Sequence, residues 1–139
     1  MTQTTIAIIT SLLLLVPAAV QAQFTYTTNN DTITIAKYTG SDSLVTIPST
    51  KNGLRVTSIG TNAFSYCTHL TSVTIPDSIN IIGSSAFYAC RLTSVTVPKS
   101  VTSIGDFAFG YCPLTNVTIH TGVLSCDANP RFHGGSFGV

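Results

Sequence analysis

The chain has 139 residues and a net charge of +1, and only 8% of its residues are charged. So few charges cannot neutralise many phosphates or form a polybasic membrane patch, which excludes nucleic acids and anionic lipid surfaces as partners. The polar character comes from hydroxyl groups instead, with 23 Thr and 15 Ser, and such side chains suit half-exposed β-strands.

Residues 1–22 are interpreted as a secretory signal peptide. An apolar run of about 15 residues, from Ile6 to Val20, is shorter than the roughly 20 residues that cross a bilayer, and the small residue Ala22 follows it. Cleavage after Ala22 would give a secreted or cell-surface protein with no stable membrane insertion. No Lys or Arg precedes the run, so an uncleaved anchor stays open as the alternative.

Residues 23–43 predict a β-hairpin. The segment from Phe24 to Thr27 alternates in the strand manner, and the segment from Ile33 to Ile35 does so again. The residues Asn29-Asn30-Asp31 between them are typical of a turn. We expect this hairpin to cap the repeated segment that follows.

Residues 44–123 contain one phrase written three times, beginning at Val56, Ile79 and Val101. The copies share isoleucine, glycine, Ala-Phe, cysteine, leucine and valine positions, spaced by 22 or 23 residues. These columns are Ile59/Ile82/Ile104, Gly60/Gly83/Gly105, Ala63/Ala86/Ala108, Phe64/Phe87/Phe109, Cys67/Cys90/Cys112, Leu70/Leu92/Leu114 and Val73/Val95/Val117. Self-similarity of this period predicts a solenoid, in which neighbouring coils cover the apolar columns of each coil.

Two strands are expected in each coil. In the first copy, the segment from Val56 to Ile59 alternates, and Gly60 then permits a sharp change of backbone direction. The segment from Ser72 to Ile75 alternates again. Pro76 closes this second strand, because proline lacks the amide hydrogen that the next ladder bond needs.

A short helix is expected between the two strands. Thr61, Ser84 and Asp106 follow the glycine in the three copies, and all three are residue types that cap helix N-termini. Phe64 and Cys67 then follow at a three-residue offset, which would place them on one face of a helix of one or two turns.

These phrases resemble the BspA-like class of leucine-rich repeats, found on bacterial and some protozoal surface proteins. The resemblance rests on Val56-Thr-Ser-Ile-Gly-Thr-Asn-Ala-Phe-Ser-Tyr-Cys and Leu70-Thr-Ser-Val-Thr-Ile-Pro, and it spans residues 45–119. It implies a mostly β, right-handed solenoid with a parallel sheet on the concave side, the short helical turns then lying on the convex side. The family is associated with adhesion. The chain departs from its pattern at Asp42, where leucine is expected, and after Ile119.

Residues 124–139 are interpreted as a degenerate last coil or an irregular tail. Val123 keeps register with Val101, and Phe132 follows Phe109 by 23 residues, but the glycine and cysteine columns are absent. An uncovered last coil would leave apolar columns open to end-to-end self-association.

Three of the four cysteines, Cys67, Cys90 and Cys112, share one column. Residues stacked in successive coils lie about 4.8 Å or more apart with parallel Cα–Cβ directions, whereas a disulfide needs Cβ atoms about 3.8 Å apart. We therefore expect buried free thiols that pack as small apolar groups, rather than disulfides.

No catalytic, metal or cofactor site is expected, and the protein is not predicted to be an enzyme. Zinc is disfavoured because no Cys or His residues have the short paired spacing of a zinc site. Cys126 with His120 and His133 could form a thiol–imidazole pair, but these residues fall in or beside the irregular tail, where such combinations arise by chance.

The outward residues of the second strand in each coil are the candidate binding surface. With Val73 and Ile75 inward, Ser72 and Thr74 face outward, and the equivalent residues of the other coils form two columns with rungs about 4.8 Å apart. The residues of this hydroxyl strip are Thr46, Ser72, Thr74, Ser94, Thr96, Asn116 and Thr118.

The hydroxyl strip favours a secreted or cell-surface binding module that engages a protein or glycan partner, because repeat proteins commonly bind through such surfaces. The alternative is a structural role, in which the chain is a solenoid segment or a truncated remnant of a longer surface adhesin with no ligand of its own.

Overall fold

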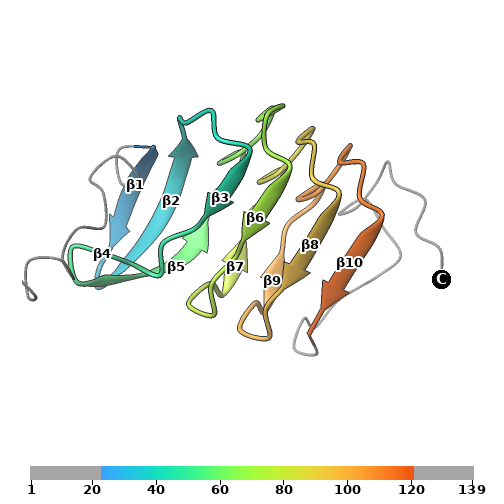
Figure 1. Cartoon of the computed structure of the whole chain (residues 1–139). Coiled ribbons are helices and arrows are strands. Elements are labelled where there is room, and N and C mark those ends of the chain that lie inside the picture. The colour runs from blue at the N-terminus through green and yellow to red at the C-terminus, as the bar shows by residue number, and fades with distance from the viewer. Residues whose placement is uncertain (1–22, 121–139) are drawn as a thin grey trace, which may run out of the picture.

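The computed structural model describes residues 23–120, and this part of the chain contains ten β-strands and no helix (Figure 1). The strands are β1 (Phe24–Asn29), β2 (Thr32–Tyr38), β3 (Leu44–Thr46), β4 (Thr50–Lys51), β5 (Leu54–Ile59), β6 (Ser72–Thr74), β7 (Ile81–Ile82), β8 (Ser94–Val97), β9 (Ser103–Ile104) and β10 (Asn116–Ile119). The signal peptide and the tail predicted for residues 1–22 and 124–139 lie outside the described residues. Across residues 23–120, no helix has the length and apolar character to span a bilayer.

The hairpin predicted near the amino end is present. β1 and β2 pair in antiparallel fashion from Phe24 opposite Tyr38 to Asn29 opposite Thr32. Asn30 in the turn has a φ of 52°, a left-handed conformation in which Asn is enriched. β2 also pairs in parallel with β5, so β1 is the outermost strand of that sheet. The capping role assigned to the hairpin stays a prediction.

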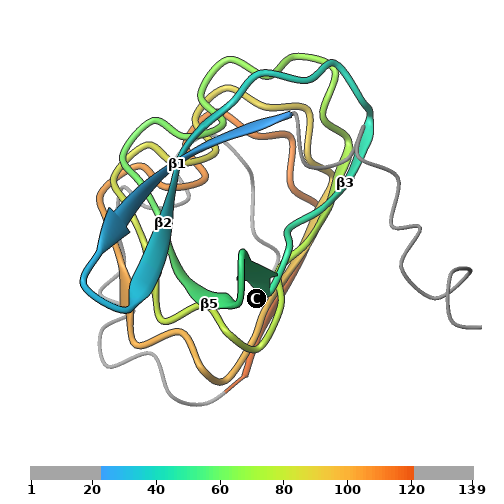
Figure 2. The ribbon, with the colours of Figure 1, turned by 90° about the vertical axis from the view of Figure 1, so that its left-hand side faces the viewer.

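Four coils stack along one axis, and each contributes one strand to each of two arrays (Figure 1). The first array is β2, β5, β7 and β9, which are hydrogen-bonded in that order and run parallel. In the second array, β3 pairs with β6, β8 pairs with β10, and β6 lies beside β8. Viewed along the axis, β2 and β3 lie on different sides of the interior (Figure 2). The handedness of the coil and the concave shape of the sheet stay predictions.

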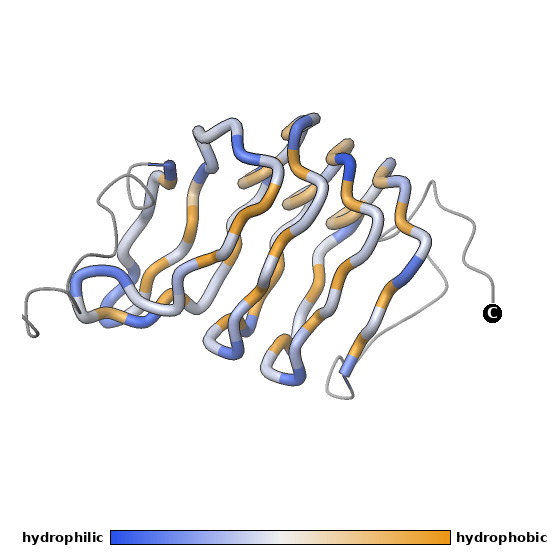
Figure 3. Tube along the Cα trace, viewed as in Figure 1, coloured by the Kyte–Doolittle hydropathy of each residue, from blue (hydrophilic) through white to orange (hydrophobic). Residues whose placement is uncertain are grey.

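The repeated apolar columns form the core, and they appear as aligned hydrophobic segments in successive coils (Figure 3). Phe64, Phe87 and Phe109 are fully buried and stack ring on ring, with centroids 4.8 Å apart in the first pair and 5.2 Å apart in the second. Tyr38 of β2 extends the stack, 5.2 Å from Phe64. The hairpin therefore supplies the aromatic ring of the first coil, and the Phe column is core as predicted.

The prediction of a short helix after each glycine is wrong. The three segments are successions of tight turns, in which two residues of each coil have left-handed backbone conformations. In the first copy these are Asn62, with a φ of 59°, and Tyr66, with a φ of 60°, and such residues interrupt a right-handed helix. The N-cap role predicted for Thr61, Ser84 and Asp106 is therefore wrong as well, because these residues have no helix to cap.

Hydrogen bonding between coils explains this difference. Alternate backbone amides of the turn segment donate to the next coil: those of Asn62, Phe64 and Tyr66 bind the carbonyls of Ser84, Ala86 and Tyr88 at 3.0, 2.7 and 2.8 Å. The amides between them close turns within the coil, as Ala63 does on the carbonyl of Gly60 at 3.2 Å. A helix of one or two turns leaves most of its terminal backbone groups unpaired, whereas the stacked turns pair theirs with a neighbouring coil.

The glycine column has a different cause from the one expected. Gly60 was expected to permit a sharp turn, but among the described glycines only Gly53 has a positive φ. A Cβ atom at Gly60 would lie 2.8 Å from the carbonyl oxygen of Ile35, and one at Gly83 would lie 2.7 Å from the backbone nitrogen of Thr61. Glycine is therefore required because the backbones of successive coils approach closely there.

Candidate binding surfaces

The predicted hydroxyl strip lies on the outer face of β3, β6, β8 and β10. In β6, Val73 is turned into the core with 8% of its surface exposed, whereas Thr74 is exposed to solvent. The strand register places Thr46 opposite Thr74 and Thr96 opposite Thr118. The structure therefore brings the seven predicted residues together on one face.

The hydroxyl strip is uncharged and regular. One column consists of Thr46, Thr74, Thr96 and Thr118, and the other of Ser72, Ser94 and Asn116. Each hydroxyl can both donate and accept hydrogen bonds. The second column begins at Leu44, which is 71% exposed, so the strip has one apolar position at the end nearest the hairpin.

The cysteine column contains free thiols, as predicted for Cys67, Cys90 and Cys112. The thiols of Cys90 and Cys112 donate to the carbonyls of Phe64 and Phe87 in the preceding coil, at 3.1 and 3.0 Å. These two cysteines are buried, but Cys67 is only half-buried, so the prediction of three buried thiols is wrong for Cys67.

The shape of the first coil explains the exposure of Cys67. Cys67 lies in the segment between β5 and β6, which has twelve residues. The corresponding segment of the first coil, between β2 and β3, has only five residues. The shorter segment covers less of the coil that follows. Burial still raises the pKa of the Cys67 thiol, while Lys37 acts in the opposite direction. Contact with the Cys112 thiol, together with burial, raises the pKa of Cys90.

These differences predict a graded labelling of the three thiols by iodoacetamide. The thiolate is the nucleophile, so at neutral pH a raised pKa slows the labelling of Cys67, which should become faster as the pH rises. Cys90 and Cys112 should stay unlabelled in the folded protein and react after unfolding. Peptide mass spectrometry would measure each site. A pair of these cysteines that stayed unlabelled after unfolding, and reacted only after reduction, would contradict the free-thiol column.

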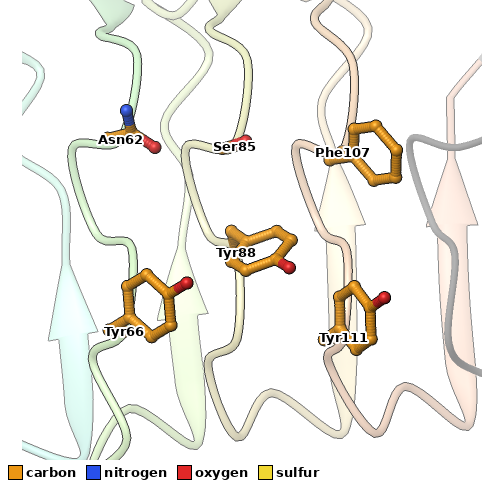
Figure 4. A pocket seen from close by; sticks show the side chains of 6 residues that line it. All are labelled: Asn62, Tyr66, Ser85, Tyr88, Phe107 and Tyr111. Atoms are coloured by element: carbon orange, nitrogen blue, oxygen red, sulfur yellow. The ribbon is translucent and has the colours of Figure 1, made fainter.

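The turn side of the solenoid carries a second surface, which the repeat pattern alone did not indicate. Tyr66 and Tyr111 are 69% and 63% exposed, and Tyr88 lies between them, with ring centroids 5.5 Å from Tyr66 and 5.1 Å from Tyr111. These tyrosines and Phe107, here called the aromatic ladder, line an open depression of about 420 Å³ (Figure 4). Asn62 and Ser85 complete its lining.

The aromatic ladder is displaced by one residue at its middle rung. Tyr66 and Tyr111 directly precede the cysteine of their copies, where the second copy has Ala89, and Tyr88 stands one residue earlier. The Tyr88 ring meets its two neighbours edge to face, at 68° and 64°, an arrangement that aromatic pairs prefer. Partial burial, Tyr111 and Tyr66 all raise the pKa of Tyr88, so its hydroxyl stays neutral at neutral pH.

Within residues 23–120, no three His, Cys, Asp or Glu side chains lie close enough together to hold a metal ion. His120 follows β10 and is exposed, and its backbone amide donates to the carbonyl of Val97 at 3.2 Å. Cys126 and His133, which were considered with it as a thiol–imidazole pair, lie outside the described residues.

The stacked coils, with their parallel strands and their buried leucine and phenylalanine columns, define a leucine-rich-repeat solenoid. The chain belongs to the family of BspA type leucine rich repeats: the model of that repeat region, described with six copies, matches residues 57–130. This confirms the resemblance seen in the sequence.

Several solved structures are similar to this chain. A leucine-rich-repeat protein of Treponema pallidum is 26% identical over 69% of this chain and 68% of that one, with a TM-score of 0.43. A leucine-rich cell surface protein of Faecalibacterium prausnitzii is 28% identical over 83% of this chain and 45% of that one, with a TM-score of 0.48. A leucine-rich-repeat protein of Bacteroides capillosus is 25% identical over 82% of this chain and 83% of that one, with a TM-score of 0.42. Thus the chain spans less than half of the F. prausnitzii protein. A search among curated proteins finds no match.

Proposed function

We propose that this protein is a secreted or cell-surface binding module without enzymatic activity, and that it engages a protein or glycan partner through the hydroxyl strip. The apolar run from Ile6 to Val20 and the small residue Ala22 after it support export from the cell. Membership of the BspA type family supports the same location, because the resemblance is to repeats of surface proteins.

The observation that carries the proposal is the alignment of exposed hydroxyl groups in register on one face. Thr46 lies opposite Thr74, and Thr96 lies opposite Thr118, while the valines between the outward residues anchor the strands in the core. The outward positions are therefore held by a rigid backbone at little cost in conformational entropy. A partner that offers hydrogen-bonding groups at the spacing of the coils would meet donors and acceptors that are already in place.

The structural alternative makes the opposite prediction. A solenoid segment that only extends a longer adhesin has no ligand of its own, and its main contacts are with coils at its two ends. Such a protein would self-associate end to end as its concentration rises, and it would bind no member of a broad panel of partners. Sedimentation analysis would detect the self-association.

Charges placed on the hydroxyl strip should abolish partner binding. We expect Thr74→Lys combined with Thr96→Glu to lose binding while the free energy of unfolding changes by less than about 0.5 kcal/mol, because both positions are exposed. The opposite signs avoid repulsion between neighbouring rungs. Binding would be measured by pull-down on a panel of immobilised matrix proteins and surface glycans.

The matched control carries the same charges on the other array. Ile81→Lys with Ser103→Glu places them on exposed, directly paired residues of β7 and β9, and this variant should bind as the wild type does. The binding of the wild type should change little with salt, because the strip holds no charge that ions could screen. Loss of binding only in the control variant would move the binding site away from the strip.

A further inference from the structure

Exposed apolar side chains concentrate on the turn side of this solenoid. Among residues 23–120, five large hydrophobic side chains are markedly exposed, and three of them, Tyr66, Phe107 and Tyr111, line the same depression. Scattered exposed apolar residues need no explanation, but a contiguous group of them does.

The stability of the fold does not explain these aromatic residues. Tyr66, Phe107 and Tyr111 all have left-handed backbone conformations, with φ of 60°, 54° and 58°, which glycine or asparagine would adopt with less strain. Asn62 occupies the position equivalent to Phe107 in the first copy, with a φ of 59°, so asparagine fits this turn. Strained residues that place rings in solvent point to a binding role rather than a packing role.

The chemistry of the depression restricts what it can bind. None of its six lining residues is charged, and the ammonium group of Lys37, which lies nearby, donates to the backbone carbonyl of Asn62 at 3.0 Å. The lining combines aromatic faces with the hydroxyl groups of tyrosine and Ser85 and the amide group of Asn62. Such a surface is complementary to a ligand that is uncharged and that presents apolar C–H faces beside hydroxyl groups, as sugar rings do.

The repetition of the rings points to a polymer. One ring from each of three successive coils follows the axis of the solenoid, with neighbouring centroids 5.1–5.5 Å apart, and the depression is open rather than enclosed (Figure 4). An open row of rings suits an extended chain of repeating units better than a single small molecule, which favours burial on most sides. We propose that the aromatic ladder is a binding site for an uncharged polysaccharide. This site is separate from the hydroxyl strip, so either can fail without the other.

The first test compares four uncharged polysaccharides with one charged polysaccharide that shares the backbone of the first. Isothermal titration of the folded protein with hydroxyethylcellulose, xyloglucan, galactomannan and dextran should show binding to at least one of these uncharged chains. Carboxymethylcellulose, which differs from the first chiefly in its negative charge, should bind more weakly. The protein has five tyrosines and no tryptophan, and three of the tyrosines belong to the aromatic ladder, so binding should also perturb tyrosine fluorescence.

The variant Tyr66→Asn with Tyr111→Asn removes two rings and keeps residues that tolerate the left-handed conformation. It should bind the same polysaccharide at least about tenfold more weakly, because tyrosines at binding surfaces often account for such losses, while its melting temperature stays equal or rises. The pair Tyr66→Phe with Tyr111→Phe keeps the rings and should retain most of the affinity. The strip variant Thr74→Lys with Thr96→Glu should bind the polysaccharide normally.

Three results would overturn the proposal. One is the absence of binding to all four uncharged polysaccharides. Another is unchanged affinity in the Tyr66→Asn, Tyr111→Asn variant. The third is equal or tighter binding of the carboxymethylated chain, which would contradict a site that selects uncharged chains.

Discussion

Replacing Phe87 by alanine should lower the free energy of unfolding by about 3–5 kcal/mol, the usual cost of emptying a large aromatic site in a core. Phe87 is fully buried and stacks between two rings, 4.8 Å from Phe64 and 5.2 Å from Phe109. The substitution leaves a cavity between two coils. Neither coil can move in to fill it without losing contact with the coil on its other side. Because the coils of a solenoid are stabilised by their neighbours, the loss of stability should shift the unfolding transition of the whole solenoid, not of one coil alone.

Urea melts of Phe87→Ala and Phe107→Ala, followed by circular dichroism, provide the measurement and its control. Phe107 is 38% exposed and lies outside the core, so its truncation should cost far less than that of Phe87. The two residues are of the same type and belong to adjacent coils, so the comparison isolates burial. Equal losses in the two variants would contradict the assignment of the stacked rings as the centre of the core.

The repeat period was sufficient to predict the core and the outward strip. A column that recurs every 22 or 23 residues has a similar environment wherever coils of the same shape flank it, so Ile59 and Ile82, which pair directly in β5 and β7, are both buried as expected. Cys67 departs from its column because the segment stacked before it is shorter. The same reasoning placed Thr74 and Thr96 outside. Periodicity reports which residues share an environment, and alternation within a strand reports which side each one faces.

The backbone of the turn segment could not be predicted in this way. A three-residue offset, such as that between Phe64 and Cys67, fits both a short helix and consecutive tight turns. The choice between them depends on amide bonds to the next coil, for example from Phe64 to Ala86 at 2.7 Å. Those bonds are non-local, so no window of a single copy contains the information.

Two further features have a signal in the sequence itself. Asn52-Gly53 is a strong hairpin signal, and the structure forms a small antiparallel pair of β4 and β5 there, with φ of 53° and 79° at the two turn residues. The aromatic ladder could have been found from Tyr66 and Tyr111. Both tyrosines directly precede the cysteine of their copies, at a position where the second copy has Ala89. This position of the repeat therefore does not require an aromatic ring for packing.

Substituting alanine for Gly83 should destabilise the solenoid by about 1–3 kcal/mol or more, because it overpacks a contact between backbones. The added Cβ would lie 2.7 Å from the backbone nitrogen of Thr61 and 2.8 Å from the carbonyl carbon of Gly60. These atoms belong to the preceding coil and cannot rotate away as a side chain would. Relief of the contact requires the coils to separate, which strains the hydrogen bond from the Gly83 amide to the carbonyl of Ile59, now 2.8 Å.

Gly53 provides the matched control, since its φ is +79° and a Cβ there would meet no atom within 4 Å. Gly53→Ala should cost about 1–2 kcal/mol from left-handed strain alone, and Gly53→Asn should cost less, because asparagine tolerates that conformation. At Gly83 the order should reverse, since asparagine is larger than alanine and the obstacle is space. Thermal melts of the four variants would show the pattern. If Gly83→Asn were more stable than Gly83→Ala, backbone conformation rather than the close approach of the coils would be the reason for glycine in this column.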